Sequence, residues 1–302
     1  MKKVVSLLLA AICLVGVSAA AGSKSSVTKI KVKNERQFLK ALGSNRVITI
    51  AKGAKLNLSK ALEDEALCNE IGMPWTDCYP EGDNGPEVVS ESRSDGRQLT
   101  FLNIYDLTIE GEKNVEIVVD PRYACVMGFI GCSNIKLKNL TLGHTEEGYC
   151  EGAVIELKSC YGFTVENCDL YGCGTYGIEA RGSDDVAFYR SIIRDCSYGI
   201  MAMGGCENAY FEDCDFYRNR EFTLLEVIDC SAKFTRCRFA QNCGKLFPKD
   251  YPLTIEDCEI HHPRFFLIDG NDWNLVHVQK LGQNDFFEDL KPLSPRKIGP
   301  KK

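Results

Sequence analysis

The stretch Phe211-Glu-Asp-Cys214-Asp-Phe216 decides the fold, because the chain repeats it. Phe234-Thr-Arg-Cys237-Arg-Phe239 follows 23 residues later, and Ile255-Glu-Asp-Cys258-Glu-Ile260 follows 21 residues after that. Each segment is too short for a helix and alternates with a period of two, which is typical of a β-strand. Three earlier segments share the pattern, so one column of residues steps along the chain by 28, 23, 23, 23 and 21 positions: Leu140, Cys168, Ser191, Cys214, Cys237 and Cys258.

Every repeat holds two further short strands. One lies downstream of the repeated segment, as in Ile155-Glu-Leu157 and Ile178-Glu-Ala180, and one runs directly into it, as in Phe163-Thr-Val165. Three strands in about 23 residues form one coil of a parallel β-helix, whose coils stack at the roughly 4.8 Å spacing of paired strands. Leucine-rich repeats would need Leu at most inward positions, and propeller blades need about twice this period. The sequence therefore predicts an all-β solenoid.

This repeat resembles the right-handed parallel β-helix proteins of the pectate-lyase-like superfamily, over roughly residues 47–267. The resemblance implies a single-stranded, right-handed parallel β-helix, and right-handed connections are the general rule between parallel strands. The amphipathic segment 34–42 begins with the N-cap candidate Asn34 and predicts a short helix that caps the open end of the stack. Segment 63–98 interrupts the repeat with Asp, Glu, Gly, Pro and Ser, so we interpret it as an inserted loop.

The chain divides into three predicted regions. The β-helix domain covers 22–268, and a C-terminal cap with a basic tail covers 269–302. The tail is expected to fray from Lys291 onward, as chain ends commonly do. The first region, 1–21, is interpreted as a signal peptide.

The leader has the composition of a secretory signal. Lys2 and Lys3 precede an apolar run at 4–17 that is too short for a stable membrane span, and the small residues 18–22 supply a cleavage site. We expect a secreted protein, or one of the periplasm or cell envelope, with no transmembrane span after removal of the leader. The mature chain would carry 36 − 2 = 34 basic and 42 acidic residues, a net charge of −8. Such a charge disfavours nucleic acid as a partner.

Most of the 16 cysteines follow the repeat. Besides the column of Cys214, a turn position holds Cys173 and Cys196 and continues as Asn219 and Asn242. Equivalent residues of adjacent coils have parallel Cβ vectors, which is poor geometry for a disulfide, so we expect mostly free, buried thiols. Cys68 and Cys78, in the inserted loop, are the pair expected to form a disulfide. No C-x-x-C pair indicates a metal site.

A candidate site lies on the outward face of the second strand set. Its outward column is predicted to contain Glu156, Glu179, Met201 and Glu226. The adjoining turns bring tyrosines, arginines and one histidine beside this column. A strip of carboxylates, tyrosine rings and guanidinium groups suits a sugar polymer, because the rings offer flat apolar faces and arginine grips carboxylates bidentately. The predicted ligand-binding residues are Glu156, Glu179, Glu226, His144, Tyr149, Tyr176, Tyr198, Arg194, Arg218 and Arg220.

Three functions remain open at this stage. The first is binding of a polysaccharide or cell-surface glycan without catalysis, which we favour. The second is cleavage of a uronic-acid polymer by a lyase or glycosidase, with Glu156, Glu179 and Arg194 as candidate catalytic residues. Two carboxylates one coil apart approach the roughly 5 Å separation of a retaining glycosidase, and a lyase would use Arg194 as base with Ca²⁺ held by the glutamates.

The third function is a structural role in the cell envelope. An acidic outward column is also what any solvated sheet face shows. The chain lacks the Gly-His-Gly and Arg-x-Lys motifs of polygalacturonase-like enzymes and the Arg-x-Pro-x-x-Arg run of pectate lyases. Fold alone does not determine function. The sequence predicts no obligatory cofactor and leaves Ca²⁺ as a possible ligand.

Overall fold

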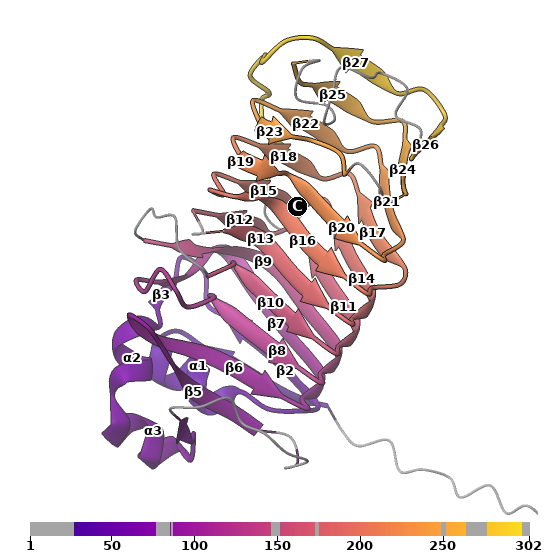
Figure 1. The fold of residues 1–302 in the computed structure, drawn as a ribbon. Helices are drawn as coiled ribbons and strands as arrows, with labels where there is room; N and C mark the ends of the chain where they lie inside the picture. The colour runs from indigo at the N-terminus through magenta and orange to yellow at the C-terminus, as the bar shows by residue number, and fades with distance from the viewer. Residues whose placement is uncertain are drawn as a thin grey trace, which may run out of the picture.

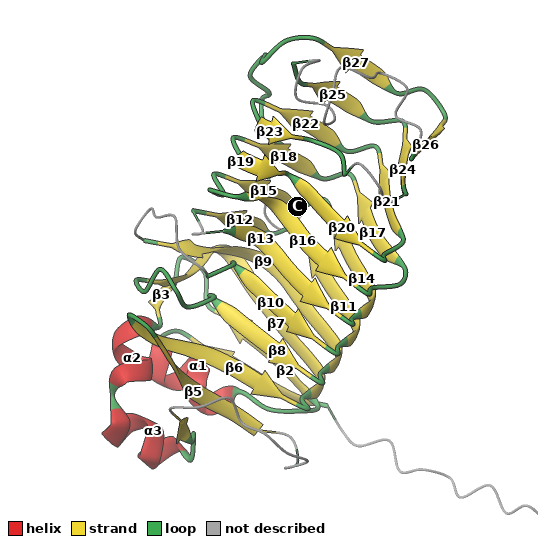
Figure 2. Cartoon of the chain, viewed as in Figure 1, coloured by secondary structure: helices red, strands yellow, loops and turns green. Residues whose placement is uncertain are grey.

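The computed structural model confirms the parallel β-helix. Its coils stack along one axis, with the helices gathered at the N-terminal end (Figures 1 and 2). None of the helices in the described part of the chain is long and apolar enough to cross a membrane. Residues 1–26, which contain the predicted leader, lie outside that part. The structure describes residues 27–76, 85, 87–145, 152–172, 175–248, 252–263 and 277–297.

Three columns of paired strands run along the stack, and we name them sheets 1, 2 and 3. Sheet 1 contains β4 (Trp75–Thr76), β5 (Glu87–Arg93), β6 (Gly96–Leu102), β8 (Met127–Ile130), β10 (Ile155–Lys158), β13 (Tyr176–Arg181), β16 (Gly199–Gly204) and β20 (Leu225–Ile228). Sheet 2 contains β1 (Thr28–Val32), β2 (Arg46–Ile50), β7 (Tyr105–Val119), β9 (Ser133–His144), β11 (Tyr161–Glu166), β14 (Asp184–Tyr189), β17 (Ala209–Glu212), β21 (Ala232–Thr235), β24 (Leu253–Glu256) and β26 (Val278–Leu281).

Sheet 3 shares the long strands β7 and β9 with sheet 2, which bend from one sheet into the other. Its remaining strands are β3 (Lys55–Asn57), β12 (Asp169–Tyr171), β15 (Ile192–Arg194), β18 (Asp215–Tyr217), β22 (Arg238–Ala240), β25 (Glu259–His261) and β27 (Asp285–Phe287). A short parallel pair, β19 (Arg220–Thr223) with β23 (Cys243–Lys245), lies beside sheets 1 and 3.

The parallel register stacks equivalent side chains into continuous ladders. Phe188, Phe211 and Phe234 pair across β14, β17 and β21, and their rings stack at centroid distances of 5.2 and 4.8 Å. Large apolar side chains packed in this way lose nearly all contact with water, and each contributes roughly 1.5–3 kcal/mol to folding. The core is therefore a stack of repeated contacts rather than one central cluster.

A left-handed residue bends each coil between sheets 2 and 3. The residue before each member of the Cys214 column has a φ between 48° and 56°: Asn139, Asn167, Arg190, Asp213, Arg236 and Asp257. Asn and Asp tolerate this conformation better than most residues. The bend turns the next side chain inward, which is why the cysteines of this column are buried.

The predicted thiol ladder is confirmed. The twelve cysteines in the described residues are free, and only Cys243 is exposed. Cys214, Cys237 and Cys258 lie in one inward column, where each thiol donates to a main-chain oxygen at 3.3–3.5 Å. Asn219 and Asn242 are fully buried, and the Asn242 side-chain oxygen accepts from both nitrogens of Asn219 at 3.0 and 3.1 Å. This ladder satisfies polar groups that the core would otherwise leave unpaired.

The N-terminal cap is present as predicted. Helix α1 (Glu35–Ala41) buries Phe38 and Leu39, and the side chain of Asn34 caps it by accepting from the amide of Gln37 at 2.9 Å. Such a cap typically stabilises a helix by about 1 kcal/mol. Two further helices, α2 (Ser59–Glu63) and α3 (Glu65–Ile71), extend this end of the molecule.

The interpretation of segment 63–98 as a loop is wrong for most of its described residues. It supplies α3, β4 and β5, and β5 pairs antiparallel with β6 as a hairpin on the edge of sheet 1. Cys68 is a buried free thiol on α3, near the main-chain oxygens of Ala61 and Leu62, so the expected disulfide with Cys78 is not formed. Cys78 itself lies outside the described residues.

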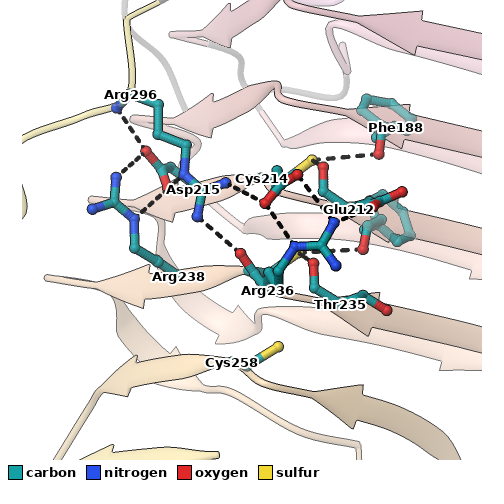
Figure 3. Close-up of polar contacts among 12 residues, drawn as sticks. Phe188, Glu212, Cys214, Asp215, Thr235, Arg236, Arg238, Cys258 and Arg296 are labelled. Atoms are coloured by element: carbon teal, nitrogen blue, oxygen red, sulfur yellow. Dashed lines mark hydrogen bonds and ion pairs between the residues drawn. The ribbon is translucent and has the colours of Figure 1, made fainter.

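The C-terminal end also differs from the prediction. Strands β26 and β27 pair with β24 and β25, so one more coil follows the predicted boundary at residue 268. Segment 288–297 is not frayed but lies against the side of the stack. There Arg296 and Arg238 hold the fully buried carboxylate of Asp215, at 3.1 and 2.6 Å (Figure 3). The two guanidinium groups compensate the charge of this buried carboxylate. The basic tail therefore makes a specific contact with the stack.

Candidate functional site

One outward column of sheet 1 supplies the two glutamates on the floor of the candidate site, Glu156 and Glu179. The register places Thr100, Gly128, Glu156, Glu179, Ala202 and Glu226 opposite one another on successive strands. Glu156 and Glu179 are therefore one coil apart, as predicted. The position predicted for Met201 belongs to Ala202, because Met201 pairs with Ile178 and points into the core. Four consecutive apolar residues, Ile200 to Met203, hide the alternation that would have set this register.

The inserted hairpin turns this column into a cleft. Residues Arg93 and Ser94 of the hairpin face Glu156 and Glu179 across a cavity of about 770 Å³. Gly128 lets the side chain of Gln98 pack over the sheet beside Glu156, since a Cβ at this position would lie 2.5 Å from the side-chain nitrogen of Gln98. The cleft is lined by Ser92, Arg93, Ser94, Tyr123, Cys125, Glu156, Lys158, Thr175, Tyr176, Glu179, Arg181 and Tyr198.

Glu156 is held from two sides. Lys158 contacts its Oε1 at 2.6 Å, and the Nη2 of Arg93 lies 3.4 Å from its Oε2. The same Arg93 nitrogen lies 3.3 Å from Glu91, a carboxylate that is only 2% exposed. Two carboxylates, one of them from the hairpin, thus share one guanidinium, which fixes the hairpin against sheet 1.

The rest of the floor is more open. Glu179 pairs with Arg181 at 3.0 Å, and the Arg181 side chain is 72% exposed. Lys158 and Arg181 each lie two residues after a glutamate on the same strand face, a period-two relation that could have been read from the sequence. Arg93 could not have been found in this way, because the insertion has no repeat. Burial and the nearby charge of Glu156 raise the pKa of the Cys125 thiol well above its usual range, so this thiol stays protonated.

Two tyrosines continue the cleft along the stack. Tyr176 and Tyr198 are neighbours, as predicted, with centroids 6.4 Å apart and rings nearly perpendicular. The hydroxyl of Tyr176 donates to Glu226 at 2.7 Å, two coils away, and the ring passes over Gly199. Burial and the bond to Glu226 raise the pKa of Tyr176, so its hydroxyl keeps the proton that it donates. Phe222, which is 54% exposed, packs edge-on against Tyr198 at 4.9 Å.

The predicted arginines lie elsewhere. Arg194 ends β15 in sheet 3, where it binds Asp169 with two hydrogen bonds of 2.9 Å and lies over the ring of Tyr171. Arg218 bonds Asp195 on the same side. Arg220 begins β19 and is exposed. The prediction of one shared strip is wrong. Each coil bends between its strand in sheet 3 and the strand of sheet 1 that follows, and this bend separates these side chains from the cleft.

The histidine of the prediction does not join the floor. His144 is buried, its Nε2 lies 2.7 Å from the main-chain oxygen of Ala124, and burial lowers its pKa. A neutral, buried imidazole of this kind supports the turn. Tyr149 lies outside the described residues.

The glutamates do not form a calcium cage. Ala202 separates Glu179 from Glu226, and Glu226 accepts the hydroxyl of Tyr176. Within the described ranges, no group of three or more His, Cys, Asp or Glu side chains is placed to hold a metal ion.

The fold matches known proteins. The model of the right handed beta helix region matches residues 126–280, which is half of the chain. This chain belongs to that family. The predicted right-handed parallel β-helix is thereby confirmed.

One curated relative of this β-helix protein is a capsule K1-specific depolymerase of Klebsiella phage K64-1. It is 29% identical over 119 residues, which are 38% of this chain and 12% of the phage protein. The chain thus spans only a small part of that relative's length.

Two solved pectate lyases share the fold. The enzyme pelN of Paenibacillus sp. 0602 superposes with a TM-score of 0.54 at 10% identity, covering 87% of this chain and 78% of its own. Bsp165PelA of Bacillus sp. N165, solved with trigalacturonate, gives a TM-score of 0.55 at 10% identity and covers 93% and 88%. At such identities the likeness describes architecture only.

Proposed function

We propose that this β-helix protein binds an acidic polysaccharide in the cleft of sheet 1. The observation that carries the proposal is the lining of the cleft. Three tyrosines, Tyr123, Tyr176 and Tyr198, lie around a floor where three cationic side chains outnumber two glutamates. Aromatic rings stack on sugar faces, and guanidinium and ammonium groups bind the carboxylates of uronic acids.

The known relatives support a polysaccharide as ligand. The matching phage protein is a capsule depolymerase, and one pectate lyase of the same fold was solved with trigalacturonate. In keeping with the predicted leader at 1–21, we place the protein outside the cytosol, where such polymers occur. Amino-terminal sequencing of the exported protein would test this location.

A binding screen tests the proposal. The purified chain is titrated with polygalacturonate, alginate and hyaluronan as acidic polymers, with and without Ca²⁺, and is followed by calorimetry. We expect at least one acidic polymer to bind, and binding to weaken at high salt because the cleft uses charged groups. Failure of every acidic polymer to bind would leave the structural role in the cell envelope.

Cleavage of the bound polymer is a second candidate, favoured by the adjacent carboxylates of Glu156 and Glu179. Both oxygens of Glu156 are held by cations, however, which favours a structural role for this carboxylate. Reducing ends and the ultraviolet absorbance of unsaturated products are followed with the same polymers. If the protein cleaves one of these polymers and Glu179→Gln abolishes the cleavage, the function is enzymatic and not binding alone.

A further inference from the structure

A second groove runs along sheet 2, away from the cleft. Two hollows of about 990 and 810 Å³ share Asn208 and Tyr210, so they form one continuous depression. Its floor is an outward column that crosses nine strands from β2 to β26: Val47, Thr108, Lys136, Thr164, Ala187, Tyr210, Lys233, Thr254 and Gln279. Eight steps of roughly 4.8 Å give a length of about 38 Å.

One side of the groove is a row of short amide and carboxylate side chains. Asn45, Asp106, Asn134, Asp185 and Asn208 occupy left-handed turn positions with φ between 52° and 57°. Left-handed turns favour Asn and Asp, which accounts for these residue types. The turns also place these side chains along one edge of the groove. Asn134 donates to Asp106, and Asn208 donates to Asp185, both at 3.0 Å. The row is therefore held in place and repeats with the period of the coils.

The middle of the groove combines a low floor with an aromatic wall. Ala187 leaves the floor low, Gly162 takes one left-handed position of the turn row without a side chain, and the rings of Tyr189 and Tyr210 lie together at 5.9 Å. A long groove with a tyrosine face and a periodic row of hydrogen-bonding groups is suited to a chain of hydroxyl-bearing rings.

The charge of the groove distinguishes it from the cleft. Its ionisable lining residues are four carboxylates and two ammonium groups: Asp106, Asp185, Glu207, Asp229, Lys136 and Lys233. An acidic polymer would be repelled there, whereas the cleft has an excess of cations. We propose that the groove of sheet 2 is a second carbohydrate site, which takes a neutral linear polysaccharide along the axis of the stack.

Calorimetry with neutral hexasaccharides tests this site independently of the cleft. The probes are cellohexaose, xylohexaose, mannohexaose, laminarihexaose and chitohexaose, with the matching disaccharides for comparison. We expect at least one hexasaccharide to bind, at least tenfold more tightly than its disaccharide, because several coils contact the longer chain. Failure of all five hexasaccharides to bind overturns the proposal, whatever the acidic polymers do.

Two variants locate the bound sugar. Tyr210→Ala removes a ring of the aromatic wall, and Ala187→Arg fills the floor. Because Ala187 is partly exposed, the second variant keeps the test valid if the first is poorly folded. Each should weaken hexasaccharide binding at least tenfold. A hexasaccharide that binds both variants as it binds the parent protein, but is lost in Tyr198→Ala, uses the cleft and overturns the proposal.

Discussion

At the scale of single residues, the cleft depends on the absence of a side chain at Gly199. A Cβ at this position would lie 2.8 Å from the ring of Tyr176 and 2.9 Å from the main-chain oxygen of Thr223. Gly199→Ala should therefore displace the ring, break its bond to Glu226 and cost about 1–3 kcal/mol of unfolding free energy, as overpacking does.

Gly204 provides a matched control on the same strand. A Cβ there would meet nothing within 4 Å, so Gly204→Ala should stay within about 0.5 kcal/mol of the parent protein in urea unfolding. Equal losses in both variants would contradict the role given to Tyr176.

The buried asparagines are a second test at this scale. Asn242 accepts from the amide of Asn219 and donates to the main-chain oxygen of Phe216 at 2.9 Å. Asn242→Ala leaves both buried groups without this partner, so we expect a loss of about 1–3 kcal/mol in unfolding free energy. A loss below about 0.5 kcal/mol would show that water replaces the side chain.

At the scale of elements, Arg93 links strand β5 of the hairpin to β10 across sheet 1, in addition to the main-chain pairing of β5 with β6 and of β6 with β8. Arg93→Ala would leave the buried Glu91 without this cation, whereas Glu156 keeps Lys158, so we expect a loss of about 1–3 kcal/mol in unfolding free energy. Urea unfolding should show this loss, and the affinity for an acidic polymer should fall with it.

Arg181→Ala is the control for charge alone. This side chain is 72% exposed, so its pair with Glu179 should contribute little to stability. A similar stability of the two arginine variants would contradict the attachment of the hairpin through Arg93.

The elements also show how far the sequence leads. The repeated strand pattern predicted the coils, the inward thiols and the neighbouring pairs Glu156–Glu179 and Tyr176–Tyr198. The amphipathic segment at 34–42 predicted the capping helix. The hairpin was missed because it is antiparallel within an otherwise parallel repeat, although its strands are adjacent in the chain and the Asp95-Gly96 pair at its tight turn is a local hairpin signal. The site of Arg194 was missed for a related reason: stacking gives the order of residues along the axis, but the bends around each coil decide which sheet presents them.

At the scale of the whole molecule, ion-pair ladders on sheet 3 make stability depend on pH. Burial would raise the pKa of Asp195, but hydrogen bonds from Arg218 and Arg194 outweigh it and hold the pKa below its usual value. Asp213 behaves likewise beside Arg236 and Arg296. A lowered folded pKa gives stability that is present above the unfolded value of about 4 and is lost as the pH falls through the folded pKa.

We therefore expect the unfolding free energy to decline below about pH 4. Asp195→Asn should flatten this decline, although it is also expected to lower stability at neutral pH by removing the carboxylate that Arg194 and Arg218 share. An unchanged slope in this variant, measured by urea unfolding across the acidic range, would contradict the contribution of the ladder. Burial raises the pKa of the neighbouring Asp169, which opposes the decline.

The most direct test of the central claim compares Tyr198→Ala with Tyr161→Ala. Both remove a partly or largely exposed tyrosine, but Tyr198 lines the cleft, whereas Tyr161 lies on sheet 2 and is 58% exposed. Calorimetric titration with the acidic polymer that binds the parent protein should show an affinity about tenfold lower for Tyr198→Ala, or about 1.4 kcal/mol, and an unchanged affinity for Tyr161→Ala. Equal affinities of both variants and the parent protein would contradict the cleft as the binding site.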